Sequence, residues 1–212
     1  MKTITIAVQK GGAGKTTIAV HLAVAAQQAG LRVALADTDP QGSAKSWAET
    51  RSDSALEVVA ITSANVGAAV AAAAEEGYDL LIVDTPPHAS AGIAAALEHA
   101  DLALMPIRPS LLDLTAAPAS IRLLQASGKP GAFILSSAPI RASETREVER
   151  ELASTGIRVL ETVIHDRTAY RRALAHGQAV GEFEPAGKAA FEVRALWREV
   201  NTLLGATKGT NA

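Results

Sequence analysis

Short apolar runs alternate along the chain with longer stretches whose apolar residues recur at helical spacing. The apolar runs predict strands at 3–8, 31–36, 56–61, 80–83, 101–109, 131–137 and 156–160. The helical patterns predict helices at 16–28, 43–50, 64–76, 91–98, 112–127, 143–154, 163–175 and 187–204. Since strand and helix alternate without an interdomain linker, we expect one α/β domain, residues 1–204, with a mostly parallel twisted sheet flanked by helices on both faces. A flexible tail is expected at 205–212.

Two of these predictions depend on particular residues. Proline cannot donate to a sheet ladder, so the strand over 101–109 is expected to stop at Pro106 and Pro109. The last helix carries its apolar residues in one stripe, while its polar side mixes acidic and basic residues. A membrane-targeting helix would favour a uniformly basic polar face, so this helix is expected to dock on the core.

Composition narrows the class of protein. Hydrophobic residues make up 48 % of the chain and aromatic residues only 3 %, so the core must be built from Ala, Val, Leu and Ile. There is no cysteine, which excludes disulfides, thiolate zinc sites and iron–sulfur clusters. No apolar run approaches the roughly 20 residues of a membrane span, and the first strand follows Met1 almost directly, so we expect a cytoplasmic protein.

Charge alone does not indicate a nucleic-acid partner. The net charge is −2, with 9 basic and 12 acidic residues over 1–140 and 11 basic and 10 acidic residues over 141–212. Any surface that binds DNA must therefore be a local patch.

Candidate chemistry begins with a glycine-rich stretch, Gln-Lys-Gly-Gly-Ala-Gly-Lys-Thr-Thr at 9–17, which lies between the first strand and the first helix. Glycines at 11, 12 and 14 let the backbone curl, so that the N–H groups of the loop point at an anion. The backbone N–H group of Ala13 is one of them. The helix that follows adds the positive end of its dipole. Lys15 would reach the β- and γ-phosphates of a nucleotide, and the Thr16 hydroxyl would ligate Mg²⁺. Thr17, the next residue, also belongs to the expected nucleotide site.

Acidic residues follow two of the later strands. Asp37 and Asp39 come directly after the second strand, and Asp84 follows the apolar run Leu-Leu-Ile-Val at 80–83. Carboxylates at strand ends beside a phosphate loop can hold Mg²⁺ through water or orient an attacking water. For Asp37 and Asp39 an alternative is open, in which they only cap the helix over 43–50.

The pattern K-G-G-x-G-K-T-T at 10–17 resembles the deviant Walker A motif of the ParA/MinD family of P-loop ATPases, and D-x-D-P-Q at 37–41 and D-T-P-P at 84–87 resemble that family's switch segments. The likeness covers nearly the whole chain and is greatest to small plasmid-type ParA proteins. It implies ATP and Mg²⁺ as cofactors, with Lys10 reaching the nucleotide of a partner subunit. It also implies that Asp39 activates the hydrolytic water, while Asp37 and Asp84 support the Mg²⁺ shell.

Two further segments bear on this resemblance. Relatives usually carry an asparagine that reads adenine after the strand over 131–137, whereas Ser136 and Ser137 stand here.

Arg167 and Arg171 are four residues apart, on one face of the expected helix, with Arg172 beside them, and resemble a family segment that binds DNA phosphates. Their alternative is a solvated face that pairs with Asp166 and nearby acids. His165 and His176 have no third ligand at metal spacing and are interpreted as structural or surface residues.

The leading hypothesis is a nucleoid-associated partitioning ATPase with slow intrinsic turnover. It forms an ATP-sandwich homodimer, binds DNA non-specifically and releases it when hydrolysis is stimulated by a small centromere-binding, ParB-type partner. One alternative positions another cargo, such as a carboxysome or chemoreceptor cluster. A second cycles on membranes as a MinD-type division regulator, although no stable membrane association is expected. A third is a metabolic phosphotransferase or ligase that resembles dethiobiotin synthetase, which would leave Lys10 without a role.

Overall fold

The computed structural model describes residues 1–52, 55–140 and 144–206. Its strands are β1 (Lys2–Ile6), β2 (Val33–Asp37), β3 (Glu57–Ala60), β4 (Leu80–Asp84), β5 (Leu102–Ile107), β6 (Gly131–Leu135) and β7 (Arg158–Val159). Its helices are α1 (Lys15–Gln28), α2 (Ser43–Glu49), the 3₁₀ turn η1 (Ser63–Asn65), α3 (Val66–Glu75), α4 (Ser90–Glu98), α5 (Leu111–Ser127), α6 (Glu144–Ala153), α7 (Thr168–Ala175), α8 (Val180–Phe183) and α9 (Lys188–Ala206).

Within the described residues the strands form one seven-stranded sheet in the order β3-β2-β4-β1-β5-β6-β7, and every pair is parallel. The α/β fold with a parallel sheet is therefore confirmed. Central strands of such a sheet are buried on both faces, which explains why Leu80–Asp84 and Leu102–Ile107 are buried throughout.

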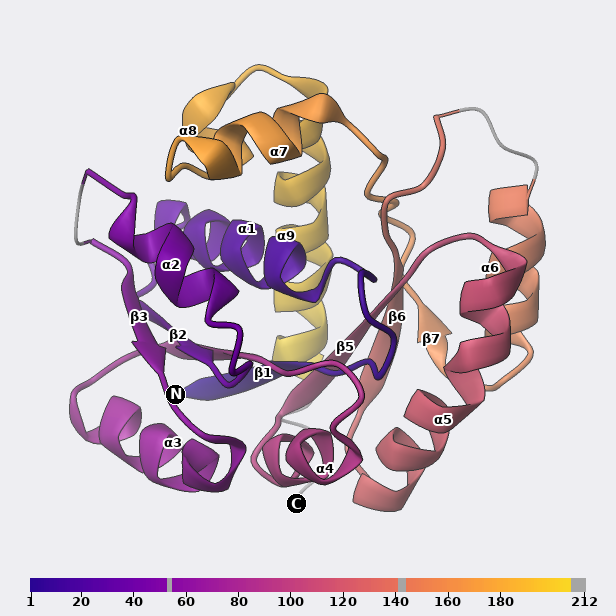
Figure 1. Cartoon of the computed structure of the whole chain (residues 1–212), viewed down its shortest axis with the longest axis horizontal. Coiled ribbons are helices and arrows are strands. Elements are labelled where there is room, and N and C mark those ends of the chain that lie inside the picture. Colours follow the sequence, from indigo (N-terminus) through magenta and orange to yellow (C-terminus); the bar gives the residue numbers. More distant parts are fainter. Residues whose placement is uncertain (53–54, 141–143, 207–212) are drawn as a thin grey trace.

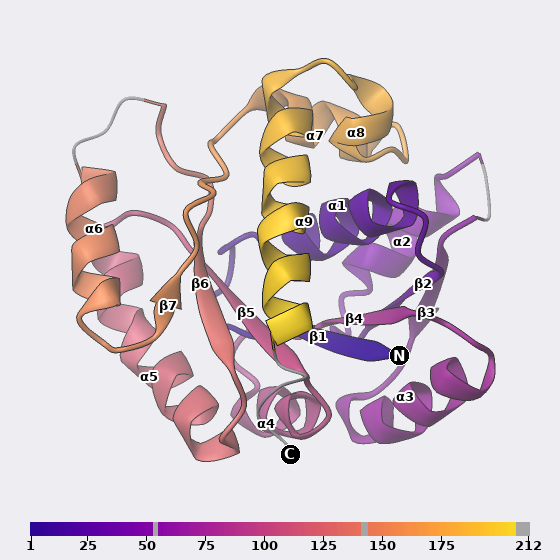
Figure 2. The same ribbon diagram turned by 180° about the vertical axis from the view of Figure 1, so that it is seen from behind.

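Helices cover both faces of the sheet (Figure 1). The cluster over one face contains buried residues of α1, α2, α7, α8 and α9, and two clusters over the other contain buried residues of α3 to α6. Figure 2 shows α9 beside α1, with its last turn in front of β1 and β5. Because the core has few aromatic side chains, close packing depends on alanine-rich helices that approach one another closely.

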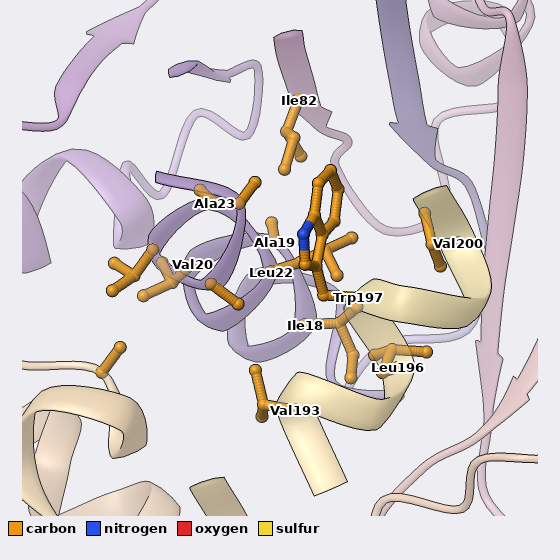
Figure 3. Close-up of a cluster of buried hydrophobic side chains, with 14 of the residues drawn as sticks. Ile18, Ala19, Val20, Leu22, Ala23, Ile82, Val193, Leu196, Trp197 and Val200 are labelled. Atoms are coloured by element: carbon orange, nitrogen blue, oxygen red, sulfur yellow. The ribbon is translucent and has the colours of Figure 1, made fainter. Parts of the chain in front are cut away.

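Trp197 of α9 fills the space between that helix and the sheet. Its side chain is only 6 % exposed and lies against Ala19 and Leu22 of α1, with Ile82 of β4 beyond the ring (Figure 3). Truncation of a buried tryptophan costs about 3–5 kcal/mol, so this contact is a major part of the attachment of α9. The predicted docking of the last helix on the core is confirmed, because its apolar stripe is buried.

Several expected boundaries are wrong. Pro106 lies inside β5, opposite Ile134, and the strand continues to Ile107. The pairing between β1 and β5 ends at Ile6 opposite Leu104. Pro106 lies beyond this point, so its missing N–H group removes no hydrogen bond from the pairing with β1.

The last two helical patterns also differ from the expectation. The helix predicted over 163–175 starts only at Thr168, and His165 instead makes a β-bridge with Ala138. The last helix runs to Ala206, so the part of the expected tail at 207–212 lies outside the described residues, as does Ser143 at the start of the helix expected over 143–154. No helix in the part of the chain that the structure describes combines the length and apolar character needed to cross a bilayer.

Candidate nucleotide site

The glycine loop joins the carboxyl end of β1 to α1, at the centre of the sheet. Gly12 and Gly14 have φ of 73° and 89°, values that L side chains rarely adopt, so glycine is needed at both positions. The sheet order reverses at β1, because the chain leaves it towards β2 on one side and later crosses to β5 on the other. Crevices at such a point are where open α/β sheets bind ligands.

A cavity of about 400 Å³ opens beside this loop. Gly12, Gly14, Lys15, Thr16 and Thr17 line it. The rest of the wall comes from five later segments and consists of Asp39, Pro87, Arg108, Ser136, Ser137 and residues of the 164–171 stretch. The structure therefore brings half of the predicted nucleotide-binding residues, together with Asp39, to one cavity. The other predicted residues do not line it: Lys10, Gly11, Ala13, Asp37 and Asp84.

The two lysines of the loop differ in environment. Lys15 is only 6 % exposed, and its Nζ donates to the carbonyl of Lys10 at 3.1 Å. Burial lowers the pKa of Lys15, while the charges of Asp84 and Asp39 oppose that shift. The Lys10 side chain, by contrast, has no hydrogen bond or ion pair with any described residue. Lys15 thus belongs to the inside of the loop and Lys10 to its mouth.

The side chains of Asp84 and Thr16 fit the requirements of a Mg²⁺ ion. The Thr16 hydroxyl donates to Asp84 Oδ2 at 2.6 Å, while Asp84 Oδ1 is buried and has no hydrogen-bond partner among the residues that the structure describes. Burial raises the pKa of Asp84 to about 7, and the negative charge of Asp37 on the adjacent strand adds to the shift. A buried carboxylate with one free oxygen beside a threonine hydroxyl and a phosphate loop has the donor chemistry that Mg²⁺ prefers.

Of the remaining two predicted aspartates, only Asp37 makes the contact with α2 that the capping alternative describes. Asp37 is 1 % exposed, and its Oδ2 accepts from the N–H groups of Ala44 and Lys45 at the start of α2. Asp39 Oδ1 accepts from the Gln41 N–H at 2.9 Å, yet Asp39 also lines the cavity. Asp37 therefore positions α2, and Asp39 remains at the cavity as the candidate water-orienting residue.

The serines that replace the expected asparagine have separate positions. Ser136 is buried, and its hydroxyl donates to the carbonyl of Ala13 at 2.8 Å, so it braces the phosphate loop. Ser137 lines the cavity with a φ of 49°, an uncommon value for a non-glycine residue. Sequence reasoning identified the substitution but missed the contact between Ser136 and Ala13, because those residues are 123 positions apart.

The three arginines assigned to DNA are all partly engaged. Arg167 precedes α7 in extended conformation, so the expected single helical face with Arg171 is wrong, and its guanidinium donates to Glu192 Oε1 at 2.6 and 2.9 Å. Arg171 pairs with Asp166 at 2.9 Å, as the alternative interpretation proposed, and stays 69 % exposed. Arg172 is exposed and lies over the ring of Phe183.

Glu192 of α9 is a functional candidate that sequence reasoning missed. Besides Arg167, it accepts from the hydroxyl of Tyr170 at 3.2 Å and contacts the ring nitrogen Nδ1 of His165 at 2.8 Å. Burial and the nearby negative charge of Glu192 raise the pKa of Tyr170. One carboxylate on α9 thereby fixes the wall of the cavity that His165, Arg167 and Tyr170 form.

Comparison with known proteins fits this geometry. Residues 4–180 match the CobQ/CobB/MinD/ParA nucleotide binding domain. The chain belongs to this family. It is 32 % identical over 207 residues to "Maintenance of carboxysome distribution protein A" of Halothiobacillus neapolitanus, covering 93 % of this chain and 95 % of that protein. It is 38 % identical over 194 residues to the protein of the same name from Gloeobacter kilaueensis, covering 90 % and 88 %.

A solved structure has the same fold. The ATP complex of McdA from Cyanothece superposes with a TM-score of 0.79 at 19 % identity, covering 97 % of this chain and 96 % of that one. The match over residues 4–180 confirms the resemblance to ParA and MinD proteins at the level of the family, and the solved structure confirms the fold.

Proposed function

We propose that this protein is a slow ATPase that dimerises around ATP, binds DNA without sequence specificity and releases it on hydrolysis. The observation that carries the proposal is the pair of lysines in the loop. Lys15 is buried within the loop, whereas the Lys10 side chain at its mouth has no partner among the described residues. A second cation placed beside an anion site but outside it is suited to the nucleotide of another subunit.

The surface beside the cavity supports a face-to-face dimer. Leu111 and Leu112, at the start of α5, are 74 % and 73 % exposed. They follow Arg108, a cavity-lining residue, by only a few positions. Large exposed apolar side chains gathered at one place mark surfaces that a partner covers. A second copy that approaches this face would bury both leucines and bring its Lys10 to the nucleotide.

The residues of the cavity divide the chemistry among them. Thr16 and Asp84 would hold Mg²⁺, whose positive charge offsets that of the phosphates when it is bound. Lys15 and the loop amides bind the phosphate oxygens, and the Asp39 carboxylate orients the attacking water. Arg171 and Arg172 contribute to a DNA-binding surface whose contacts with phosphates are sensitive to salt.

Co-sedimentation with DNA in ATP, in ADP and without nucleotide tests this proposal, with liposomes run in parallel. We expect DNA binding in ATP only, weakened by added salt, and no liposome binding. Liposome binding in ATP would favour the membrane-cycling alternative. Turnover that depends on a small-molecule substrate would favour the metabolic alternative.

Two sets of variants refine this test. Asp39→Ala should trap an ATP-bound dimer, seen as a doubled mass in light scattering, and normal hydrolysis by this variant would refute the role of Asp39. Arg171→Glu with Arg172→Glu should weaken DNA binding without preventing dimerisation. The matched control is the same charge change at Arg146 and Arg150, which are exposed on α6. Because Arg171 lines the cavity, nucleotide affinity is measured for each variant.

The cargo separates two forms of the proposal. The two relatives named for carboxysome distribution align with 93 % and 90 % of this chain. This similarity favours an intracellular body as the cargo. The other form is partition of a plasmid or chromosome, helped by a ParB-type activator. Deletion of the gene distinguishes them, since the first predicts clustered or unevenly inherited bodies and the second predicts loss of a DNA element from dividing cells.

A further inference from the structure

Arg108 is a cavity-lining residue to which neither the sequence motifs nor the proposed cycle gives a role. It directly follows β5, at the carboxyl edge of the sheet, next to the strand that leads into the glycine loop. A Cβ atom built on Gly12 would lie 3.8 Å from the Arg108 Nη2 atom. The guanidinium therefore lies over the loop itself, on the side of the cavity that Gly12 and Lys15 line.

Every other cation on the wall of this cavity is engaged. Lys15 donates to the Lys10 carbonyl, Arg167 donates to Glu192 and Arg171 pairs with Asp166. The Arg108 side chain, by contrast, is exposed, and its guanidinium has no hydrogen bond or ion pair with any residue that the structure describes. A planar guanidinium beside a loop of backbone N–H groups, with no carboxylate to neutralise it, is complementary to a phosphate.

The backbone around Arg108 is fixed on both sides. Pro109 follows it and is buried, and the Ser110 N–H donates to the Arg108 carbonyl at 2.8 Å. The Ser110 hydroxyl then accepts from the Asp113 N–H and caps α5. Only the side chain of Arg108 has to be ordered by a ligand, so little backbone entropy opposes binding.

The phosphate nearest to Arg108 can be inferred from Lys15. The 3.1 Å contact between Lys15 Nζ and the Lys10 carbonyl places that amine at the beginning of the loop, beside the peptide that joins Lys10 to Gly11, and Gly12 and Lys15 line the same cavity. A lysine in this position reaches the β- and γ-phosphates. Since Arg108 overlies Gly12, it faces the same end of the phosphate chain.

We infer that Arg108 is a further nucleotide-contacting residue, which donates to the terminal phosphate of a nucleoside triphosphate bound by its own subunit. This inference rests on the proposed function, and it adds a means by which one subunit favours ATP over ADP before it meets a second copy. Lys10 acts on the partner's nucleotide, whereas Arg108 acts within the subunit.

The test is a fluorescence titration of ATP and of ADP, at protein concentrations where light scattering shows monomers. R108Q should lose about tenfold in affinity for ATP, the loss expected for one charge-assisted hydrogen bond, while its affinity for ADP changes little. R108K, which keeps the charge but not the planar fork, should lie between R108Q and the wild type. R122Q is the matched control, because Arg122 is exposed on α5 and does not line the cavity.

Several results would overturn the inference. Unchanged ATP affinity in R108Q, or an equal loss for ATP and ADP, would exclude a contact with the terminal phosphate. A loss that appears only at concentrations where dimers form would assign Arg108 to the partner's nucleotide instead. Failure of the wild type to bind ATP at all would refute the proposed function first, and this outcome is distinct because it does not depend on Arg108. An unchanged melting temperature of R108Q confirms that folding is not the cause.

Discussion

His21, in the middle of α1, should make the stability of this protein fall in mild acid. It is 2 % exposed, its Nδ1 accepts from the Val180 N–H at 3.3 Å, and its Nε2 is buried without a hydrogen-bond partner in the described part of the chain. The ring also packs edge-on against Tyr170, with 5.1 Å between centroids. No acidic side chain stabilises a protonated ring among these contacts, and burial lowers the pKa of His21 from 6.5 to about 3.

The sign and size of the effect follow from this shift. The folded state keeps His21 neutral, whereas the unfolded chain takes up a proton below pH 6.5, so acid favours unfolding between pH 6.5 and about 3. Between pH 7.5 and pH 5.0 the free energy of unfolding should fall by about 2 kcal/mol through this residue alone. His21→Gln keeps an acceptor for the Val180 N–H but cannot be protonated, and should lose that part of the pH dependence.

Urea denaturation at the two pH values measures this, with the fluorescence of Trp47 and Trp197, both buried, as the signal. The quantity compared is the difference between the two pH values, because His21→Gln also loses ring packing at both. His176→Gln is the control, since His176 is exposed at the end of α7. If His21→Gln retains the wild-type fall in stability, the neutral buried histidine is not the cause and the reasoning fails.

Three other predictions concern the cavity and its rim. Lys15→Gln should abolish productive ATP binding in a titration, and wild-type affinity would count against the loop assignment. Ser136→Ala leaves the Ala13 carbonyl unsatisfied, so it should cost about 1–3 kcal/mol of stability in urea denaturation and weaken nucleotide binding; unchanged values for both would exclude the bracing role. Leu111→Asp with Leu112→Asp should prevent the ATP-dependent doubling of mass in light scattering while ATP binding at low protein concentration persists, and an unaffected dimer would place the interface elsewhere.

The fold and the centre of the site could be predicted because both depend on local patterns. Apolar runs that end in glycine or aspartate define strands, and the carboxyl ends of parallel strands meet at one edge, which brings Lys15 and Asp84 together. The side chain contact between Thr16 and Asp84 is the expected consequence of that edge. The backbone topology alone places these groups beside one another.

What the sequence could not show depends on contacts between distant residues. No local sequence pattern indicates that Glu192 would form hydrogen bonds with Arg167, Tyr170 and His165. The carboxylate belongs to α9, whereas these three residues lie just before α7 or in its first turn. The same limit applies to Pro106, whose place inside β5 depends on how far the neighbouring strand β1 extends.

The glycine loop is bonded to three surrounding segments, and this links the ligand site to the outer helices. The Gln9 N–H donates to the Ser120 hydroxyl of α5 at 3.1 Å, and the Gln9 carbonyl accepts from His88 after β4 at 3.0 Å. Ser136 holds the far side of the loop through Ala13. A displacement of Gln9 must therefore either carry α5 with it or break the bond to Ser120. Because α5 begins with the exposed Leu111 and Leu112, this hydrogen bond connects the glycine loop to the helix that carries those leucines at the molecular surface.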